Sequence, residues 1–272
     1  MKIKEMRLII FIVVITLSAC NLNAVTFNSI NEFEKWLSAQ SDNTVDTPYA
    51  VKLNISSLNG GFQSTGSLGS VLNNNKDKYV NLDLSGSTFT LIDNAAFVNC
   101  LSLTSMKIPK GVTIIEKSAF LGCSNLNNII IPDSVTIIDF EAFASCNSLT
   151  GIILPNSIKI IVTGTFRGCE NLKNIIIPNN VTDIMMDAFS YCKSLTSITI
   201  PKSVNVIERY AFLDCNNLTS VTFLGTIPYS NNYYCEYPFD GDLREKFYAT
   251  DKVNGTPGTY IREKYGTVWT RK

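Results

Sequence analysis

Histidine is absent from this chain of 272 residues. Its absence removes the commonest general base and the commonest metal ligand near neutral pH, and it excludes any nucleophile activated by a histidine. Net charge is absent as well, because 23 Lys and Arg residues balance 23 Asp and Glu residues. Binding to nucleic acid requires a basic surface, so we expect no nucleic-acid partner. Hydrophobic residues make up 45% of the chain, which is enough for a sizeable core.

A hydrophobic run long enough to cross a membrane is also missing. The apolar stretch Leu8–Leu17 follows the basic residues Lys2, Lys4 and Arg7, and it is too short for a typical spanning helix. A charged start followed by a short apolar run is typical of an export signal. The stretch runs into LSAC, which ends at Cys20. This ending resembles the lipobox of bacterial lipoproteins. The resemblance implies that Cys20 is acylated and becomes the mature N-terminus, and an ordinary signal peptide is the alternative.

A lipid on Cys20 would attach the protein to a membrane. Two or more acyl chains anchor a protein stably, because each buried methylene contributes about 0.8 kcal/mol. The next residue is Asn21 rather than Asp. In the sorting rule of enteric bacteria, a residue other than Asp is compatible with the outer membrane. We therefore expect an exported, lipid-anchored protein at the outer membrane or cell surface.

A period of 23 residues dominates the rest of the sequence. Four rows of residues keep this period in register over more than 100 residues, which chance does not produce. The rows are Phe97, Phe120, Phe143, Phe166, Phe189 and Phe212; Cys100, Cys123, Cys146, Cys169, Cys192 and Cys215; Leu103, Leu126, Leu149, Leu172, Leu195 and Leu218; and Pro109, Pro132, Pro155, Pro178 and Pro201.

The sequence of each unit predicts two extended segments and a turn. A leucine-led segment with alternating apolar residues, such as Leu195–Ile200, predicts a strand, which proline ends because it cannot donate to a sheet. Residues such as Val181 and Ile184 predict a second, short extended segment. Gly, Asn, Ser or Asp precede most of the cysteines and suit a turn. One unit cannot bury its own Leu, Ile and Phe, so we expect the units to stack as coils whose identical side chains form ladders.

The phrase L-x-x-L-x-L is that of leucine-rich repeats. With proline after the strand and A-F-x-x-C at the return, residues 80–223 resemble the Treponema-type, or BspA-like, class of these repeats. The resemblance implies a β-rich leucine-rich-repeat solenoid and a bacterial surface lipoprotein. One row departs from the family, which often has glycine after the isoleucine that precedes A-F, so we expect the local turn to differ. Here that row is Asp93, Glu116, Asp139, Val162, Met185 and Glu208.

The ends of an open stack expose apolar edges and need caps. Asn28 or Ser29 predicts the start of a helix, with Ile30, Phe33 and Leu37 on one face. Strands are expected from Tyr49 and from Tyr79 onward. The sequence therefore predicts an α+β cap before the repeats.

A degenerate first coil is predicted before the regular repeats. In it, the L-x-x-L-x-L positions are taken by Tyr79, Leu82 and Leu84, and one extra residue precedes Phe89. The aromatic tail predicts a short helix over 243–248 and a closing strand. Its aromatic residues are expected to pack the end of the core, and a ligand platform is the alternative. The predicted division is a signal peptide at 1–19, an N-terminal linker and cap at 20–78, the solenoid at 79–223 and a C-terminal cap at 224–272.

Cysteines at a fixed spacing allow three interpretations. Paired C-x-x-C ligands are missing, which disfavours zinc, and we predict no metal and no cofactor. Disulfides between neighbouring coils are conceivable outside the cytoplasm. Because every unit places a cysteine close to a phenylalanine of the core, we favour buried thiols that act as small hydrophobic residues. Cys235 lies outside the ladder and has no assigned role.

Alternate residues of each strand point away from the core and form an exposed sheet. Stacked isoleucines rimmed by Asn, Ser and Thr are typical of a protein-binding face. The alternatives are the high strand propensity of isoleucine or a tail that covers the face. One outward row reads Ser105, Asn128, Gly151, Asn174, Ser197 and Ser220. The residues predicted to form the binding face are Lys107, Asn128, Ile130, Ile153, Asn174, Ile176, Thr199 and Thr222. A second, less regular apolar group on the return turns is Phe140, Val162, Met185 and Met186.

An anchored, uncharged solenoid with an exposed sheet predicts a protein-binding or adhesion module rather than an enzyme. The family resemblance implies a host matrix protein or a cell-surface protein as partner. Carboxylate pairs such as Asp139 and Glu141 lie on a turn without a partner pattern, so we expect them to be solvated. The alternative function is a non-catalytic structural or antigenic envelope protein without a specific host ligand, which includes a periplasmic scaffold.

Overall fold

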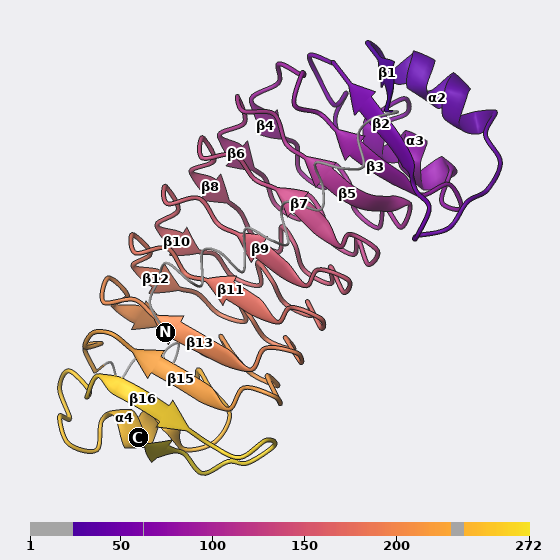
Figure 1. Ribbon diagram of the computed structural model, residues 1–272. Coiled ribbons are helices and arrows are strands. Elements are labelled where there is room, and N and C mark those ends of the chain that lie inside the picture. Colours follow the sequence, from indigo (N-terminus) through magenta and orange to yellow (C-terminus); the bar gives the residue numbers. More distant parts are fainter. Residues whose placement is uncertain (1–23, 62, 230–236) are drawn as a thin grey trace.

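Successive coils of the repeat stack into an elongated solenoid (Figure 1). The computed structural model describes residues 24–61, 63–229 and 237–272. Each coil carries a first strand, and every coil except the last also carries a short second strand among the described residues. The first strands are β3 (Val80–Asp83), β5 (Leu103–Lys107), β7 (Asn128–Ile130), β9 (Gly151–Ile153), β11 (Asn174–Ile176), β13 (Ser197–Ile200) and β15 (Ser220–Phe223). The second strands are β4 (Leu91–Ile92), β6 (Ile114–Ile115), β8 (Ile137–Ile138), β10 (Ile160–Ile161), β12 (Asp183–Ile184) and β14 (Val206–Ile207).

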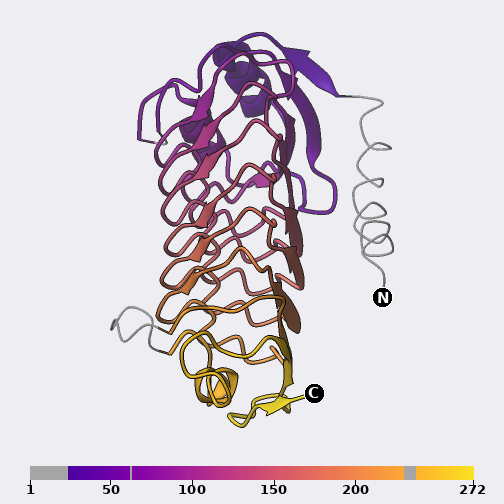
Figure 2. The ribbon, with the colours of Figure 1, turned by 90° about the vertical axis from the view of Figure 1, so that its left-hand side faces the viewer.

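Parallel pairing holds neighbouring coils in the register of the sequence repeat. Ile153 pairs with Ile176, and Ile115 pairs with Ile138, in each case 23 residues later. β7 lies beside β9, and β11 beside β13, although regular ladder pairing is interrupted at both places. The first strands line one side of the solenoid and the second strands line another (Figure 2). The predicted β-rich solenoid is confirmed.

A column of phenylalanine rings runs through the core. The ring centroids of Phe97 and Phe120 lie 5.2 Å apart, and those of Phe120 and Phe143 also lie 5.2 Å apart, with ring planes 9° and 2° from parallel. The column continues past the repeat, since Phe239 of the tail stacks on Phe212 with centroids 4.6 Å apart. Stacking follows from the coil spacing, because parallel strands are about 4.8 Å apart. Each ring is therefore buried by the coil above and the coil below.

Two residues of each return turn adopt the left-handed backbone conformation, with φ between 53° and 73°. Backbone N–H groups of the turn donate to the next coil, as from Ala95 to the carbonyl of Lys117 (2.9 Å) and from Asn99 to that of Leu121 (2.8 Å). The left-handed residues thus direct N–H groups along the stack. The row that departs from the family's glycine has no positive φ, so its Asp, Glu, Val and Met residues fit without backbone strain. The left-handed positions are Ala95, Ser118, Glu141, Gly164, Asp187 and Tyr210, and Asn99, Gly122, Ser145, Gly168, Tyr191 and Asp214.

The N-terminal cap continues the sheet and covers the first coil. The hydroxyl of Ser29 accepts a hydrogen bond from the N–H of Glu32, and the carboxylate of Glu32 accepts one from the N–H of Asn28. This reciprocal capping fixes the start of the predicted helix, whose Ile30, Phe33 and Leu37 are buried. The predicted helix is confirmed. The elements are β1 (Val25–Phe27), α2 (Ile30–Ser38), β2 (Tyr49–Leu53) and α3 (Leu68–Asn74), and β2 pairs with both β1 and β3.

The first coil differs from its prediction in one place. Val80, not Tyr79, pairs with Leu103, and the register then shifts so that Leu82 pairs with Met106. The shift accommodates Thr104 in β5, whose hydroxyl donates to the carbonyl of Val80 at 3.0 Å. A bulge therefore joins the cap to the regular repeat.

The tail closes the other end with α4 (Leu243–Phe247), β16 (Gly258–Ile261) and β17 (Thr270–Arg271). β16 pairs with β15 in the antiparallel direction and so ends the parallel stack. Both the short helix and the closing strand were predicted, and both are confirmed. Tyr260 and Trp269 are fully buried, whereas Tyr265 is 67% exposed, so the tail's aromatic residues divide between the core and the surface.

Arg262 supplies the hydrogen bonds that another coil would make. Its side chain donates to the carbonyls of Leu218 (2.7 Å), Cys215 (3.0 Å) and Gly266 (2.9 Å). The carboxylate of Asp240 lies 3.8 Å from the guanidinium, which is 3% exposed. Burial lowers the pKa of Arg262, and the nearby Asp240 opposes that change. The last coil therefore ends without unpaired carbonyls at these positions.

Candidate functional site

The sheet formed by the first strands carries the predicted binding face. Ile153 and Ile176 lie side by side in register and are 53% and 42% exposed. Ile130 lies on the neighbouring strand β7 and is half-buried. Of the other predicted residues, Lys107, Asn174 and Thr199 are exposed, and Asn128 and Thr222 are half-buried. The solenoid thus brings the predicted residues to one face, which is centred on an exposed isoleucine pair.

The polar row beside the isoleucines is less uniform than its sequence suggests. Ser105 is 7% exposed, and its hydroxyl donates to the amide oxygen of Asn81 at 2.7 Å. This hydrogen bond buries the start of the row against β3 of the first coil. At the other end, the hydroxyls of Thr222 and Thr259 lie 2.9 Å apart across β15 and β16. The described part of the tail extends the sheet at its edge and leaves Ile153 and Ile176 exposed.

A second aliphatic row lies on the return strands β4, β6, β8 and β10. Ile137 and Ile160 are 47% and 43% exposed there, and Leu91 and Ile114 are half-buried. This row was not predicted, although the Ile-Ile pairs at 114–115, 137–138 and 160–161 carried the signal. Only the second isoleucine of each pair faces the core. The less regular group that was noted on the return turns is half-buried throughout: Phe140, Val162, Met185 and Met186.

The cysteine row forms a ladder of buried, hydrogen-bonded thiols. The thiol of Cys123 donates to the carbonyl of Phe97 at 2.9 Å, and that of Cys169 donates to the carbonyl of Phe143 at 3.1 Å. Burial raises the pKa of Cys123 and of Cys169 from 9.0 to about 12. The described cysteines are free, and no group of side chains among the described residues could hold a metal ion. The prediction of buried thiols is confirmed.

The predicted signal peptide at 1–19 and the acylation site Cys20 lie outside the described residues, and so does the unassigned Cys235. The carboxylates considered for catalysis have partners in the coil instead. Glu141 is paired with Arg167, and Asp139 accepts a hydrogen bond from the N–H of Phe140. Among the residues that the structure describes, no helix is long and apolar enough to cross a membrane.

Stacked parallel coils of 23 residues, each with buried leucine, phenylalanine and cysteine, define a leucine-rich repeat protein. The chain belongs to the BspA type leucine rich repeat family, whose model matches residues 90–219 in 6 copies. Members of this repeat family have protein-binding or structural roles.

Two solved bacterial structures resemble this chain. The leucine rich repeat protein of T. pallidum is 32% identical, with a TM-score of 0.51, and the match covers 58% of this chain and 71% of that chain. A leucine rich cell surface protein of Faecalibacterium prausnitzii is also 32% identical, with a TM-score of 0.53, and covers 67% of this chain. This chain spans 46% of that longer protein. No curated protein matches the sequence.

Proposed function

We propose that this protein is a surface-anchored binding module whose sheet face contacts a partner protein. The observation that carries the proposal is the exposed pair Ile153 and Ile176 on a rigid, regular sheet. Large aliphatic side chains held in water at neighbouring positions lose unfavourable hydration when a partner covers them. The rim of Asn174, Thr199 and Lys107 supplies polar contacts around them.

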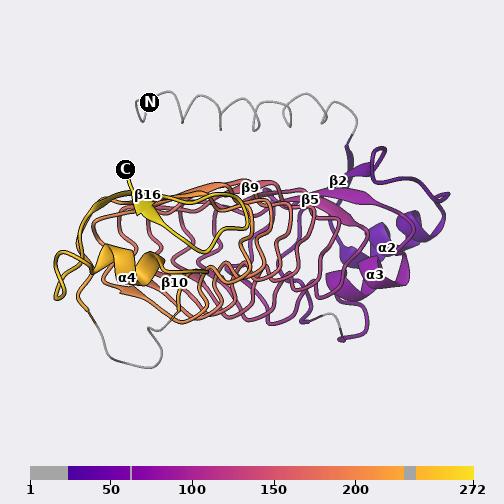
Figure 3. The same cartoon turned by 90° about the horizontal axis from the view of Figure 1, so that it is seen from below.

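The anchor in this proposal is a lipid on Cys20. β1 begins at Val25, five residues after Cys20, so a lipid there would hold the first cap close to the membrane. The remaining coils lie progressively farther from that cap along the rod (Figure 3). A surface-displayed rod of this kind suits adhesion to host matrix or to other cells. The surface location of the F. prausnitzii relative supports this reading.

A binding assay with two matched variants tests the face. Ile130, Ile153 and Ile176 are changed together to Asn in the mature protein, which is then titrated against immobilised extracellular-matrix proteins. We expect at least a tenfold loss of affinity, since removing a few buried aliphatic contacts costs more than about 1.4 kcal/mol. The control variant changes Ile137 and Ile160 to Asn, because their exposure is similar to that of Ile153 and Ile176 but they lie on the return strands. Equal affinities of the face variant and the unaltered protein would remove the proposed face.

The alternative is a structural envelope protein, which the regular, capped rod also supports. It predicts no saturable binding to any matrix protein or bacterial surface. Protease treatment of intact cells separates display from a periplasmic location, because only a displayed rod is cleaved.

A further inference from the structure

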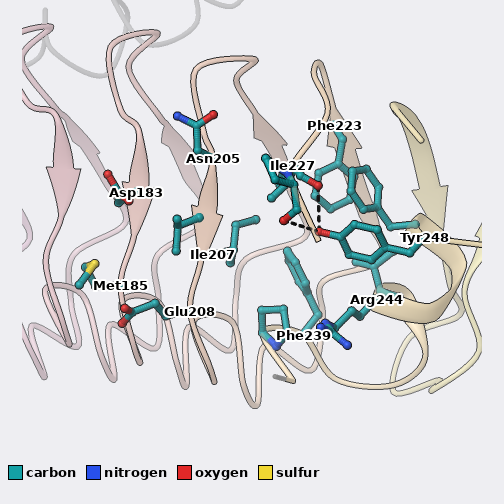
Figure 4. A pocket seen from close by; sticks show the side chains of 15 residues that line it. Asp183, Met185, Asn205, Ile207, Glu208, Phe223, Ile227, Phe239, Arg244 and Tyr248 are labelled. Atoms are coloured by element: carbon teal, nitrogen blue, oxygen red, sulfur yellow. Dashed lines mark hydrogen bonds between the residues drawn. The ribbon is translucent and has the colours of Figure 1, made fainter. Parts of the chain in front are cut away.

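A hollow lies where the C-terminal cap meets the last return strands. Its volume is about 330 Å³, and its two walls come from different parts of the chain. β12 and β14 form the solenoid wall, while α4 and the segment around Ile227 form the cap wall (Figure 4). The hollow lies on a different side of the solenoid from the proposed binding face, so it is independent of that proposal.

The floor of the hollow is apolar and largely aromatic. Phe239, Phe247 and Ile227 are buried, and they belong to the packed junction between coil and cap. Phe223 and Phe247 pack against each other with ring centroids 4.3 Å apart. A fixed aromatic floor of this kind favours an apolar stem or ring, and aromatic faces also attract cations.

Two carboxylates face the hollow from the solenoid wall. Asp183 occupies the row that holds isoleucine in the preceding coils at Ile137 and Ile160, so a single acidic residue interrupts this aliphatic row at the edge of the hollow. Asp183 pairs in register with Val206, and Glu208 follows two residues later, so both side chains project from the same face.

Neither carboxylate is neutralised by a cation of the described chain. One oxygen of Glu208 accepts from the N–H of Met186 at 2.9 Å, and one oxygen of Asp183 accepts from the hydroxyl of Thr182 at 2.5 Å. No ion pair among the described residues includes Asp183 or Glu208. Both are half-buried, so their negative charge is less screened than on an open surface.

The positive charge at the hollow lies on the cap wall. The guanidinium of Arg244 is over the rings of Tyr229 and Tyr248, at 4.7 Å and 5.8 Å from their centroids. The hydroxyl of Tyr248 donates to the carbonyl of Ile227 at 3.0 Å and holds that wall in place. A cationic ligand is therefore directed away from the cap wall and toward Asp183 and Glu208.

We propose that this hollow binds an ammonium group carried on an apolar stem. The stem packs on the floor of Ile227, Phe239 and Phe247, and the ammonium group lies on the wall that carries the negative charges of Asp183 and Glu208. The same chemistry is offered by a lysine side chain of a partner protein and by a free organic amine.

Isothermal titration of the mature protein tests the proposal with matched probes. The free amine is phenethylamine with 2-phenylethanol as its neutral counterpart, and the peptide is acetyl-Phe-Lys-amide with acetyl-Phe-Gln-amide as its counterpart. We expect at least one charged probe to bind at least tenfold more tightly than its counterpart, and to weaken as NaCl rises from 50 to 500 mM. Binding of the amine alone identifies a free amine as the source, and binding of the peptide identifies a lysine side chain.

Two sets of variants locate the binding. The double variant Asp183→Asn with Glu208→Gln keeps the hydrogen-bond acceptors but removes the charge, and we expect at least tenfold weaker binding. The control Glu170→Gln removes an exposed carboxylate that pairs with Lys193, and affinity should not change. Val206→Phe, which fills the hollow from a half-buried position, should abolish binding. Equal binding of charged and neutral probes, absence of binding by both charged probes, or unchanged affinity in the double variant would overturn the proposal.

Discussion

Replacing Phe143 by alanine should lower the free energy of unfolding by about 3–5 kcal/mol. The ring is fully buried and stacks on Phe120 and Phe166, with centroids 5.2 Å and 5.8 Å away. Its removal leaves a gap between two rungs that the coil spacing prevents from collapsing, because each coil is also held by its strands. Urea unfolding followed by circular dichroism measures the loss.

Phe140 provides the matched control on the same coil. Its ring is half-buried on the return turn, 5.2 Å from the ammonium nitrogen of Lys117. Phe140→Ala should cost no more than about 1 kcal/mol, since little buried contact is lost. If the two variants lose the same free energy of unfolding, the stacked phenylalanine column does not contribute more to the stability of the solenoid than an ordinary half-buried side chain.

Alkaline pH should destabilise the protein steeply, and the buried thiols should be the main cause. Burial raises the pKa of Cys123 and Cys169 from 9.0 to about 12, and it raises the pKa of the other ladder thiols in the same direction. In the unfolded chain the thiols lose their protons near pH 9, whereas in the folded chain they keep them. Their contribution to the free energy of unfolding is therefore complete below pH 9. It declines as the pH rises toward 12, by up to about 1.4 kcal/mol per pH unit for each thiol.

Urea unfolding under reducing conditions at several values between pH 7 and pH 10 measures this dependence. The double variant Cys123→Ala with Cys169→Ala removes two of the six ladder thiols, so the slope above pH 9 should fall by about one third. Burial also raises the pKa of Tyr260, whose smaller contribution is the same in both proteins. A free energy of unfolding that stays constant up to pH 10 would contradict the role given to the ladder.

The repeat made most of the solenoid predictable. Leucine, phenylalanine and cysteine recur at one spacing, so a structural prediction made for one coil applies to all the coils. The burial of Cys146 and the exposure of Ile153 followed from that spacing and from strand alternation alone. The helix α2 was predictable for a different reason, since Ser29 and Glu32 form a local capping pattern.

Features without a repeat were not predictable in the same way. Helix α3 has only seven residues and no charged residue in its first or last turn, so its stability comes from burial of Leu68, Val71 and Leu72. The bulge at Thr104 depends on how the cap meets the first coil. The hollow beside β14 joins residues such as Asp183 and Phe247, which are distant in sequence and lie in unlike segments. Only the packing of coil and tail brings them together.

The closure of the last coil by Arg262 and β16 has a consequence for how such proteins can change in length. Each coil contacts its immediate neighbours, so a duplicated 23-residue unit inserted in the middle would meet the same partners on both sides. Neither terminus would need to adapt. Gene duplication could therefore lengthen the solenoid in steps of about 4.8 Å, while the N-terminal and C-terminal caps keep the same contacts.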